Sequence, residues 1–395
     1  MNKWTKIVLF IGIAFTLIGW GKYIIPTHIE ISDVQVVRVM GMDSSPDNGV
    51  SFSILFQPPK GVEEEGDNKE KYLIVSANSF ASTSRGLQHC EDKLFIGSHV
   101  DDILLGEKLA QDNLAHAMEF ISKNDEFRLD SKVYIVKEMS TSKVFEDGLG
   151  NGYILSDRIN KLSLTKKGDV DVRTVEVLDV LKILLSEDKV GVIPCIQVIR
   201  NGEEQLADYK IVGAKEEANR VELAGYGVIN KGRLVGYLNN DESTGYEYIK
   251  NLISEEGISL NTKNGVVGIN LTAANSKIKF DFDGDNIKKV TINVTTKNSI
   301  LETATGKNIF NSGIDEIEKM ENEKLEEIIK STVRYAQNSN IDFIDIGKSL
   351  AFSHPYKWRK IKDHWDEIFP GITIDVKVNS RIEEEYGVLS IANEG

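Results

Sequence analysis

The sequence predicts a mixed α/β, or α+β, protein: a multi-domain ectodomain of mixed sheets with packed helices, behind an N-terminal transmembrane helix. Short apolar segments alternate with amphipathic helical segments over residues 72–136, which is typical of sheets covered by helices. Alternating segments over residues 266–294 precede a long amphipathic segment between residues 314 and 336. An apolar run over residues 7–25 is interrupted by Lys22 alone.

The composition excludes some classes of protein. The chain has 395 residues, of which 41% are hydrophobic and 27% charged, so it is globular and long enough for two or three domains. Its formal net charge is −14, and removing the first 25 residues leaves 44 Lys+Arg against 61 Asp+Glu, a balance of −17. This acidity argues against nucleic acid or an anionic lipid surface as the main ligand of the folded part.

The apolar N-terminal segment predicts a membrane anchor. As a helix, residues 7–25 would span about 28 Å, close to the hydrocarbon thickness of a bilayer. Lys3 and Lys6 precede it, so the positive-inside rule places the chain from about residue 26 onward outside the cytoplasm. A cleaved signal peptide is the alternative, although Gly19-Trp20-Gly21 is a weak substitute for a cleavage site of the Ala-x-Ala type.

The ectodomain is expected to begin with a β-hairpin. Apolar residues over 29–39 mark one strand, and strict alternation over 50–56 marks a second. Residues 44–49, Ser-Ser-Pro-Asp-Asn-Gly, supply turn chemistry between them.

Periodicity then predicts an alternation of helices and strands. The expected elements are strand 72–75, helix 80–94, strand 100–105, helix 110–121, strand 132–136, helix 175–185, strand 192–199, hairpin 221–229 and 233–238, helix 246–253, strands 266–271, 277–282 and 289–294, helix 314–336, helix 355–369 and strand 372–378.

Helical spacing also predicts which side chains face the core. One face of helix 110–121 consists of Ala110, Leu114, Ala117, Met118 and Ile121. Helix 175–185 is expected to be lined by Val175, Leu178, Leu181, Leu184 and Leu185. Trp358, Ile361, Trp365 and Phe369 have helical spacing and are expected in the core, with a docking face for a partner as the alternative.

Residues 208–220 are polar and weakly patterned, which makes them the expected linker. They divide the chain into a membrane anchor or signal-like helix (1–25), an N-terminal mixed α/β region of one or two subdomains (26–206) and a C-terminal α+β domain (221–395). No fixed-period repeat is visible.

The two cysteines, Cys90 and Cys195, are too few for a disulfide framework. We expect buried thiols, and a single bridge between them stays open because the N-terminus implies an oxidising compartment. Residues 281–285, Asp-Phe-Asp-Gly-Asp, resemble part of a calcium loop, but position six lacks glycine and position twelve is Ile292. A turn between two strands is the better interpretation.

Two groups of side chains could carry chemistry. Ser98, His99, Asp101 and Asp102 are close in sequence, but neighbouring residues of a strand point to opposite faces, which disfavours a nucleophile and base pair. His354 and His364 lie ten residues apart, and Glu367 alone is spaced as a further ligand. We therefore expect no catalytic, metal-binding or cofactor-binding residues.

Several blocks of the sequence are specific when their order and spacing are considered together. They are Glu30-Ile31 with residues 36–43, Phe56-Gln-Pro-Pro59, Lys93-Leu-Phe-Ile-Gly-Ser-His99 with Gly106-Glu-Lys-Leu-Ala110, residues 125–129, residues 225–245 and residues 358–378. In these blocks the chain resembles the Ger(x)C family of spore germination proteins, the C subunits of nutrient germinant receptors. The resemblance covers nearly the whole ectodomain.

The resemblance implies a lipoprotein on the outer face of the spore inner membrane, with a mixed α/β ectodomain. It also implies two polytopic receptor subunits as partners and no known enzymatic activity. Where the family has Leu-x-Gly-Cys-Trp, this chain has Leu17-Ile-Gly-Trp20, and no cysteine occurs before Cys90. We therefore expect no lipidation at the usual place, so that the apolar helix tethers the protein alone.

The leading hypothesis is a non-catalytic subunit of a germinant receptor, located at the spore inner membrane and docked on its two polytopic partners. Whether the subunit contacts the small-molecule germinant stays open. The alternatives are a cell-envelope hydrolase built on His99 with Asp101 or Asp102, and a solute-binding protein. The lack of a paired nucleophile and base disfavours the first, and the lack of an obvious two-lobed repeat disfavours the second.

Overall fold

The computed structural model describes residues 3–4, 34–45, 49–57, 70–89, 94–150, 153–162, 174–200, 219–253, 256–263, 265–303 and 311–385. The expected anchor over residues 7–25, most of the expected linker and Cys90 lie outside these residues. Within the described part of the chain, no helix is long and apolar enough to cross a membrane.

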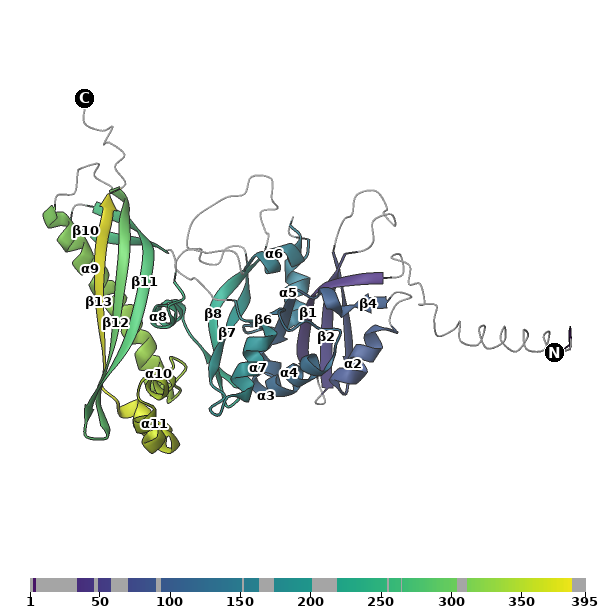
Figure 1. The fold of residues 1–395 in the computed structure, drawn as a ribbon. Helices are drawn as coiled ribbons and strands as arrows, with labels where there is room; N and C mark the ends of the chain where they lie inside the picture. The colour runs from purple at the N-terminus through teal and green to yellow at the C-terminus, as the bar shows by residue number, and fades with distance from the viewer. Residues whose placement is uncertain are drawn as a thin grey trace, which may run out of the picture.

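The first sheet, called sheet 1, has nine strands in the order β3-β2-β1-β5-β6-β7-β8-β9, with β4 paired to β1 (Figure 1). Neighbours among β1, β5, β6 and β7 are parallel, whereas β2, β3, β8 and β9 join antiparallel. The strands are β1 (Val34–Ser45), β2 (Gly49–Phe56), β3 (Lys71–Ala77), β4 (Leu94–Ile96), β5 (Asp102–Gly106), β6 (Lys132–Val136), β7 (Gly191–Ile199), β8 (Arg220–Asn230) and β9 (Arg233–Tyr237).

Helices cover both faces of sheet 1. Its two apolar clusters involve α2 (Phe80–Leu87), α3 (Glu107–Asp112), α4 (Leu114–Lys123) and α7 (Val177–Leu185) in one, and α5 (Thr141–Gly148) and α6 (Leu155–Leu162) in the other. The central strands β5 and β6 are accordingly apolar on both sides, as parallel strands buried between helices are. The five residues expected on one face of helix 110–121 are buried, and Met118 is a core residue.

The second sheet, called sheet 2, has the order β10-β11-β12-β13. Its strands are β10 (Glu256–Thr262), β11 (Gly265–Asp283), β12 (Asn286–Thr303) and β13 (Ile374–Glu385). The long helix α9 (Asn311–Ser339) packs against it through buried residues such as Leu325, Ile329 and Val333. Exposed side chains, including Lys277, Lys279 and Lys297, alternate with buried ones along the strands. The expected long amphipathic helix is confirmed.

Helix α8 (Asn240–Lys250) lies between the two sheets (Figure 1). A capping box between Asn239 and Glu242 starts it, and every residue from Ser243 to Ile249 is buried. Small residues allow this burial, since a Cβ on Gly245 would lie 2.1 Å from Thr332 Oγ1 of α9. Around α8 the apolar side chains of both sheets form one continuous cluster.

The C-terminal helical segment differs from the single helix expected over residues 355–369. It consists of α10 (Ile346–Ser353), α11 (Pro355–Ile361) and α12 (Trp365–Ile368), with 3₁₀ turns at Lys362–His364 and Phe369–Gly371. In one straight helix Trp358 and Trp365 would be about 10.5 Å apart along the axis. Their ring centroids are 5.2 Å apart, because the break after Ile361 folds the two indoles together.

Two other expectations were wrong for tertiary reasons. Helix α2 ends at Leu87, and Leu94 instead begins β4, because residues 94–96 pair in parallel with residues 34–36 of β1. The strands expected at 266–271 and 277–282 are one strand, β11, because the polar residues between them also pair with β12. The hairpins β1–β2 and β8–β9 are confirmed.

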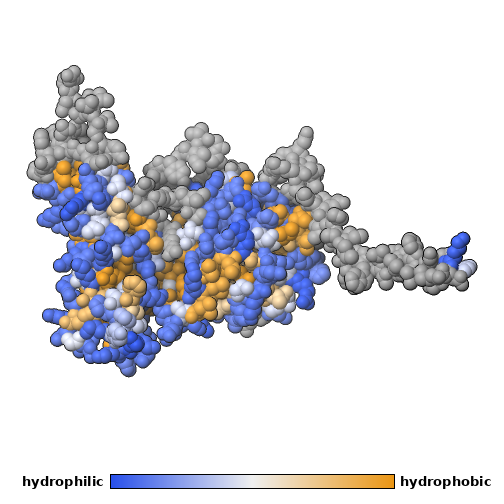
Figure 2. Space-filling view, viewed as in Figure 1, coloured by the Kyte–Doolittle hydropathy of each residue, from blue (hydrophilic) through white to orange (hydrophobic). Residues whose placement is uncertain are grey.

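The surface in view is mainly hydrophilic, with separate hydrophobic areas (Figure 2). Helix α7 contributes to the exposed apolar surface, since the exposed fractions of Leu178 and Leu185 are 43% and 84%. The expectation that both side chains line the core was wrong. Val177 and Val180 are the residues of α7 that are buried. Val175, just before the helix, is buried as expected, and Leu181 and Leu184 pack partly buried against the same cluster.

Candidate functional site

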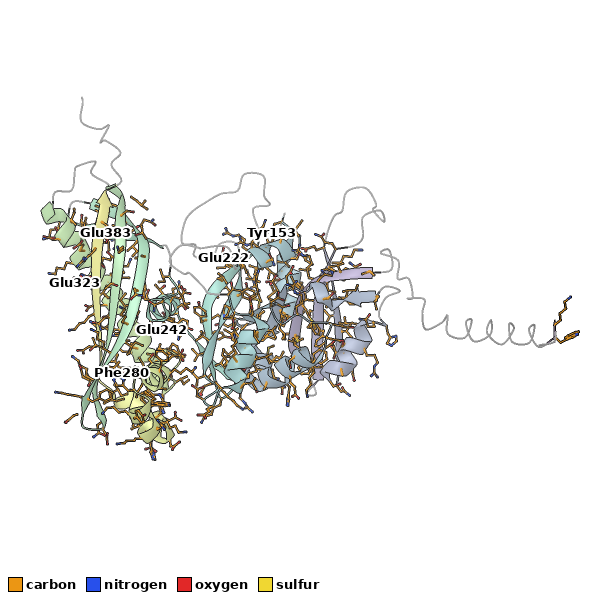
Figure 3. The ribbon with its side chains drawn as sticks, in the orientation of Figure 1. Tyr153, Glu222, Glu242, Phe280, Glu323 and Glu383 are labelled. Atoms are coloured by element: carbon orange, nitrogen blue, oxygen red, sulfur yellow. The ribbon has the colours of Figure 1, made fainter. Side chains whose placement is uncertain are left out.

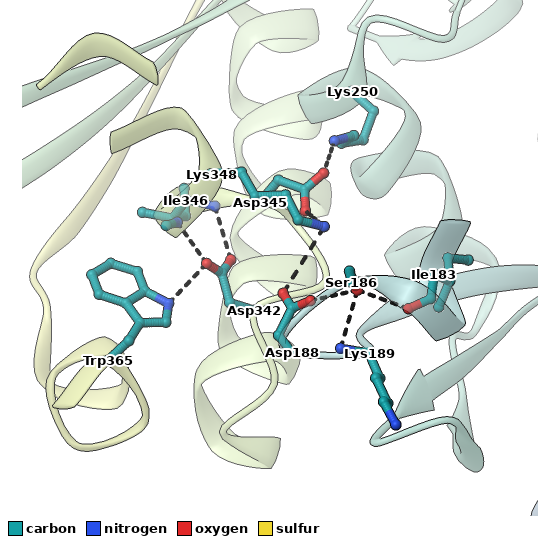
Figure 4. A network of polar contacts seen from close by, with 11 residues as sticks. Ile183, Ser186, Asp188, Lys189, Lys250, Asp342, Asp345, Ile346, Lys348 and Trp365 are labelled. Atoms are coloured by element: carbon teal, nitrogen blue, oxygen red, sulfur yellow. Dashed lines mark hydrogen bonds and ion pairs between the residues drawn. The ribbon is translucent and has the colours of Figure 1, made fainter. Parts of the chain in front are cut away.

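A network of charged side chains lies where the two sheets meet (Figure 4). Lys250 ends α8, Asp342 and Asp345 lie in the loop between α9 and α10, and Lys348 belongs to the first turns of α10. Asp188 comes from the other side, in the loop between α7 and β7. The network therefore joins parts of the chain more than 150 residues apart in sequence.

Asp345 is the centre of this network. It has left-handed backbone geometry, with φ of 61°, and its carboxylate accepts a hydrogen bond from Lys250 Nζ. Lys348 Nζ lies 2.9 Å from Asp345 Oδ1 and 4.0 Å from Asp188 Oδ2. Burial lowers the pKa of Lys348, but the charges of Asp345 and Asp188 outweigh it and the pKa is raised. We call Lys250, Asp345 and Lys348 the ion triad.

Asp342 links the start of α10, the helix that carries Lys348, to Trp365 of α12. Its carboxylate accepts hydrogen bonds from the backbone N–H groups of Ile346 at 2.9 Å and Gly347 at 2.6 Å, and from Trp365 Nε1 at 3.0 Å. It thus satisfies two of the free N–H groups at the start of α10. Burial raises the pKa of Asp342 to about 7, although the hydrogen bonds from Gly347 and Ile346 oppose this shift.

Glycine is required at position 347 by close packing. A Cβ there would lie 2.9 Å from the ring of Trp365 and 3.0 Å from that of Trp358. Trp365 and Phe369 are buried, and Trp358 and Ile361 pack against the same cluster. The expectation that these four residues belong to the core is confirmed. Their docking role, the alternative, is not needed to explain them.

The structure exposes two aromatic side chains of the same segment that sequence reasoning did not single out. Phe352, at the end of α10, is 93% exposed, and Tyr356, in α11, is 77% exposed. Arg359 lies over the Tyr356 ring at 4.8 Å. A signal was present for Phe352, because the buried residues Ile346 and Leu350 lie on another face of α10. We call Phe352, Tyr356 and Arg359 the aromatic corner.

The residues considered for a hydrolase do not form a catalytic pair. His99 is exposed in a 3₁₀ turn, while Asp101 forms ion pairs with Arg38 at 3.7 Å and Arg128 at 3.9 Å. Asp102 is buried, and burial raises its pKa to about 6. Its carboxylate accepts a hydrogen bond from Asn160 at 3.3 Å. Among the described side chains, no hydrogen bond or ion pair joins His99 to Asp101 or Asp102.

The histidines near the C-terminus also serve local packing. His354 packs against the ring of Phe282, with centroids 4.9 Å apart, whereas His364 lies 3.6 Å from Glu367. Within the described ranges, no cluster of three or more His, Cys, Asp or Glu side chains could hold a metal ion.

The remaining sequence features have structural roles. Gly284, with φ of 60°, and Asp285 form a two-residue turn between β11 and β12, so the expected turn at residues 281–285 is confirmed. Cys195 is a free, buried thiol in β7, and burial raises its pKa. The possible partner Cys90 lies outside the described residues.

Comparisons with known proteins agree with the sequence blocks. Two family models match: "Spore germination protein N-terminal domain" over residues 27–198 and "Spore germination B3/GerAC like, C-terminal" over residues 224–386. Spore germination protein KC of Bacillus subtilis (strain 168) is 23% identical over 367 residues, covering 89% of this chain and 90% of that protein. Spore germination protein B3 of the same organism is 23% identical over 348 residues, covering 86% and 88%.

A solved structure has the same fold. The crystal structure of the GerBC protein aligns with a TM-score of 0.57 and 19% identity, covering 87% of this chain and 97% of that one. At this identity the match establishes the architecture of two mixed sheets with packed helices.

Proposed function

The chain belongs to the Ger(x)C family of spore germination proteins, and we propose that it is a non-catalytic subunit of a nutrient germinant receptor. In this proposal residues 7–25 tether it to the spore inner membrane, with the described part on the outer face. It docks on two polytopic subunits of the same receptor and helps convert nutrient binding into germination. Family membership supports the role in germination, since both family models match in order along one chain.

The observation that carries the docking role is the aromatic corner. Large aromatic side chains and arginine are favoured as anchors in protein interfaces. Phe352 and Tyr356 are presented to solvent on short helices whose neighbours, Trp358 and Trp365, are fixed by packing on Gly347. The packed core therefore holds the backbone of the corner, so the entropy lost when a partner covers it would come mainly from the exposed side chains. We place the contact with a polytopic subunit there.

The first experiment deletes the gene for this subunit. Spores of the deletion strain should lose the response to the cognate nutrient, while germination by a chemical bypass that does not need the receptor stays intact. Wild-type nutrient germination in the deletion strain would contradict the proposed role.

The second experiment tests the docking surface with point variants. Phe352→Ala or Tyr356→Ala should weaken association with the partner subunits by about 1–3 kcal/mol for each large anchor. Spores carrying both changes should germinate poorly at normal protein levels. His99→Ala is the control, because its exposed ring has no expected role and should leave germination unchanged.

An inactive but folded and abundant His99→Ala protein would favour the hydrolase instead. If the Phe352→Ala, Tyr356→Ala double variant co-purifies normally with the partner subunits, the docking surface is not the aromatic corner.

The tether is tested by mass spectrometry of protein extracted from spore membranes. The intact mass should include residues 7–25 and no lipid, because no cysteine precedes Cys90. A mature chain that starts beyond Trp20 would show that the segment is a cleaved signal peptide.

A further inference from the structure

A cavity of about 190 Å³ lies at the junction of the two sheets, next to the ion triad. Three stretches of chain line it, within residues 175–192, 226–250 and 343–348. Lining residues from α7, β7 and β8 belong to the part of the molecule that contains sheet 1. The other lining residues come from α8, from the loop before α10 and from α10 itself. The cavity is therefore complete only when the two sheets are packed together.

Part of the cavity lining is aromatic and apolar. Tyr226, Tyr246 and Phe343 follow one another there, with ring centroids 5.2 and 6.1 Å apart. Their exposed fractions are 0%, 8% and 2%, so the rings are held by the surrounding core. Val192 and Ile183 continue the apolar wall. These side chains suit a hydrocarbon group of a ligand.

Other residues of the lining carry charges of both signs. Lys250 and Lys348 line the cavity together with Asp179 and Asp345. Each lysine ammonium has three N–H donors, and Asp345 accepts from both lysines, so each ammonium keeps donors for a further acceptor. Asp179 lies 2.9 Å from Lys182, and a carboxylate can accept more than one hydrogen bond. The cavity thus offers donors and acceptors at fixed positions.

We propose that this cavity binds a small amino-acid-like zwitterion with an apolar side chain. The carboxylate of the ligand would face Lys250 and Lys348, its ammonium would face Asp179 and Asp345, and its side chain would lie against Tyr246 and Phe343. The lining holds two cations, Lys250 and Lys348, and two anions, Asp179 and Asp345. A ligand with a single net charge would leave one unit of charge uncompensated in this partly desolvated site, which is energetically unfavourable. The volume is below the range of drug-sized pockets, so we expect about ten non-hydrogen atoms.

The proposal goes beyond docking and does not depend on it. Ligand binding is measured on the isolated full-length protein in detergent, whereas docking is measured through partner association and germination. Either can fail without the other.

The experiment uses three probes of similar shape: L-leucine, leucinamide, which lacks the carboxylate, and 4-methylpentanoate, which lacks the ammonium. Saturation-transfer NMR detects contact, and equilibrium dialysis gives the Kd. L-Leucine should bind, and each analogue should bind at least tenfold more weakly, because each loses one set of ionic partners.

Two variants locate the site, and a third is the control. Lys250→Met and Lys348→Gln should each weaken L-leucine binding at least tenfold, and the more exposed Lys348 makes the second change safer for folding. Lys330→Met removes a lysine of α9 that pairs with Glu326 at 2.8 Å, away from the cavity, and should leave the Kd unchanged.

Three results would overturn the proposal: no contact with L-leucine, binding of leucinamide or 4-methylpentanoate as tight as that of L-leucine, or an unchanged Kd in both Lys250→Met and Lys348→Gln. Circular dichroism melting of each variant checks that it is folded, and if Lys250→Met is not, Lys348→Gln decides.

Discussion

The two sheets bury their side chains in different ways. Sheet 1 has helices on both faces, so its central strands are buried throughout, whereas along sheet 2 exposed side chains alternate with buried ones and α9 packs on its buried face. The sheets also differ in their connections, since sheet 1 contains parallel neighbours joined through helices and sheet 2 is largely a meander of long strands.

This difference indicates which substitutions should destabilise each part of the molecule. A change in sheet 1 acts on a core that is closed on both sides, so its effects come through stability. Sheet 2 depends on a single helix layer, α8 and α9, which carries several buried polar groups, including Glu321 and Thr332. Substitutions in that layer are therefore the sharpest tests of how the second half is held together.

The largest effect is expected at the crossing of α8 and α9. A Cβ at Gly245 would lie 2.1 Å from Thr332 Oγ1 and 2.8 Å from the carbonyl oxygen of Ile328, so Gly245→Val must push the helices apart. We expect a loss of about 3 kcal/mol or more in the free energy of unfolding, measured by urea denaturation. Gly257→Val in β10 is the matched control, because nothing lies within 4 Å of its Cβ. Equal losses in both variants would show that the close crossing does not matter.

The second effect is a pH dependence centred on Glu321. This side chain is fully buried beside sheet 2, where Thr296 Oγ1 and Asn298 Nδ2 donate to it at 3.1 and 2.9 Å. Burial raises its pKa from 4.5 to about 7, because the hydrogen bonds from Thr296 and Asn298 offset only part of the desolvation.

The sign of the pH effect follows from linkage. The folded state favours the protonated carboxyl, so the stability that Glu321 contributes is complete below its unfolded pKa of 4.5 and is lost as the pH rises through about 7. Glu321→Gln should be more stable than the wild type at pH 8, by on the order of 3 kcal/mol, and nearly equal to it at pH 4. Urea denaturation at both pH values measures the difference.

Glu323→Gln is the control for this pH test, since Glu323 is on the same helix but 69% exposed (Figure 3). A Glu321→Gln protein that is less stable than the wild type at pH 8 would mean that the ionised carboxylate is needed by its donors.

The smallest effect is expected at the edge strand β13. Three side chains of α9, Glu318, Asn322 and Glu326, accept hydrogen bonds from the backbone N–H groups of Ile382, Ser380 and Val378 at 2.9, 2.8 and 3.5 Å. Four residues of helix rise about 6 Å and two residues of strand about 6.7 Å, so the two spacings match. The helix thereby occupies an edge that would otherwise be open to another strand.

Asn322→Ala should cost about 1–2 kcal/mol in the free energy of unfolding, because it leaves the N–H of the buried residue Ser380 without its acceptor. Glu323→Ala, one position further on the exposed side, should cost far less. Urea denaturation compares the two variants. A negligible effect of Asn322→Ala would show that solvent replaces the lost acceptor.

Local sequence patterns predicted most individual helices and strands, but not which of them pair or pack together. Alternation over residues 50–56 predicted a strand of the first hairpin, and the spacing of Ala110 to Ile121 predicted buried side chains that the structure confirms. The same spacing failed at Asn113, with φ of −135°, where α3 ends and α4 begins. It failed again in α7, where nearly every residue is apolar and periodicity could not choose the inward face.

The candidate site could not be predicted as a unit. Lys250 and Asp345 look like ordinary solvent-exposed charges in the sequence, and Asp188 follows an apolar helix with no motif around it. Their meeting depends on α8 lying between the sheets, a tertiary arrangement in which Gly245 lets α8 approach α9 closely and which no local pattern indicates. The reason for glycine at position 347 is the position of two indole rings, which no local pattern indicates.

The sequence by itself determined the class of fold, the family and the amphipathic character of α9, because these depend on composition and on side-chain periods within a few turns or strands. The tertiary structure alone decided that β4 pairs with β1, that Phe352 and Leu185 are exposed, and that a charged cavity forms at the junction of the sheets. These features arise from contacts between residues far apart in the chain, whose geometry is set by the packing of the whole core and not by local preference.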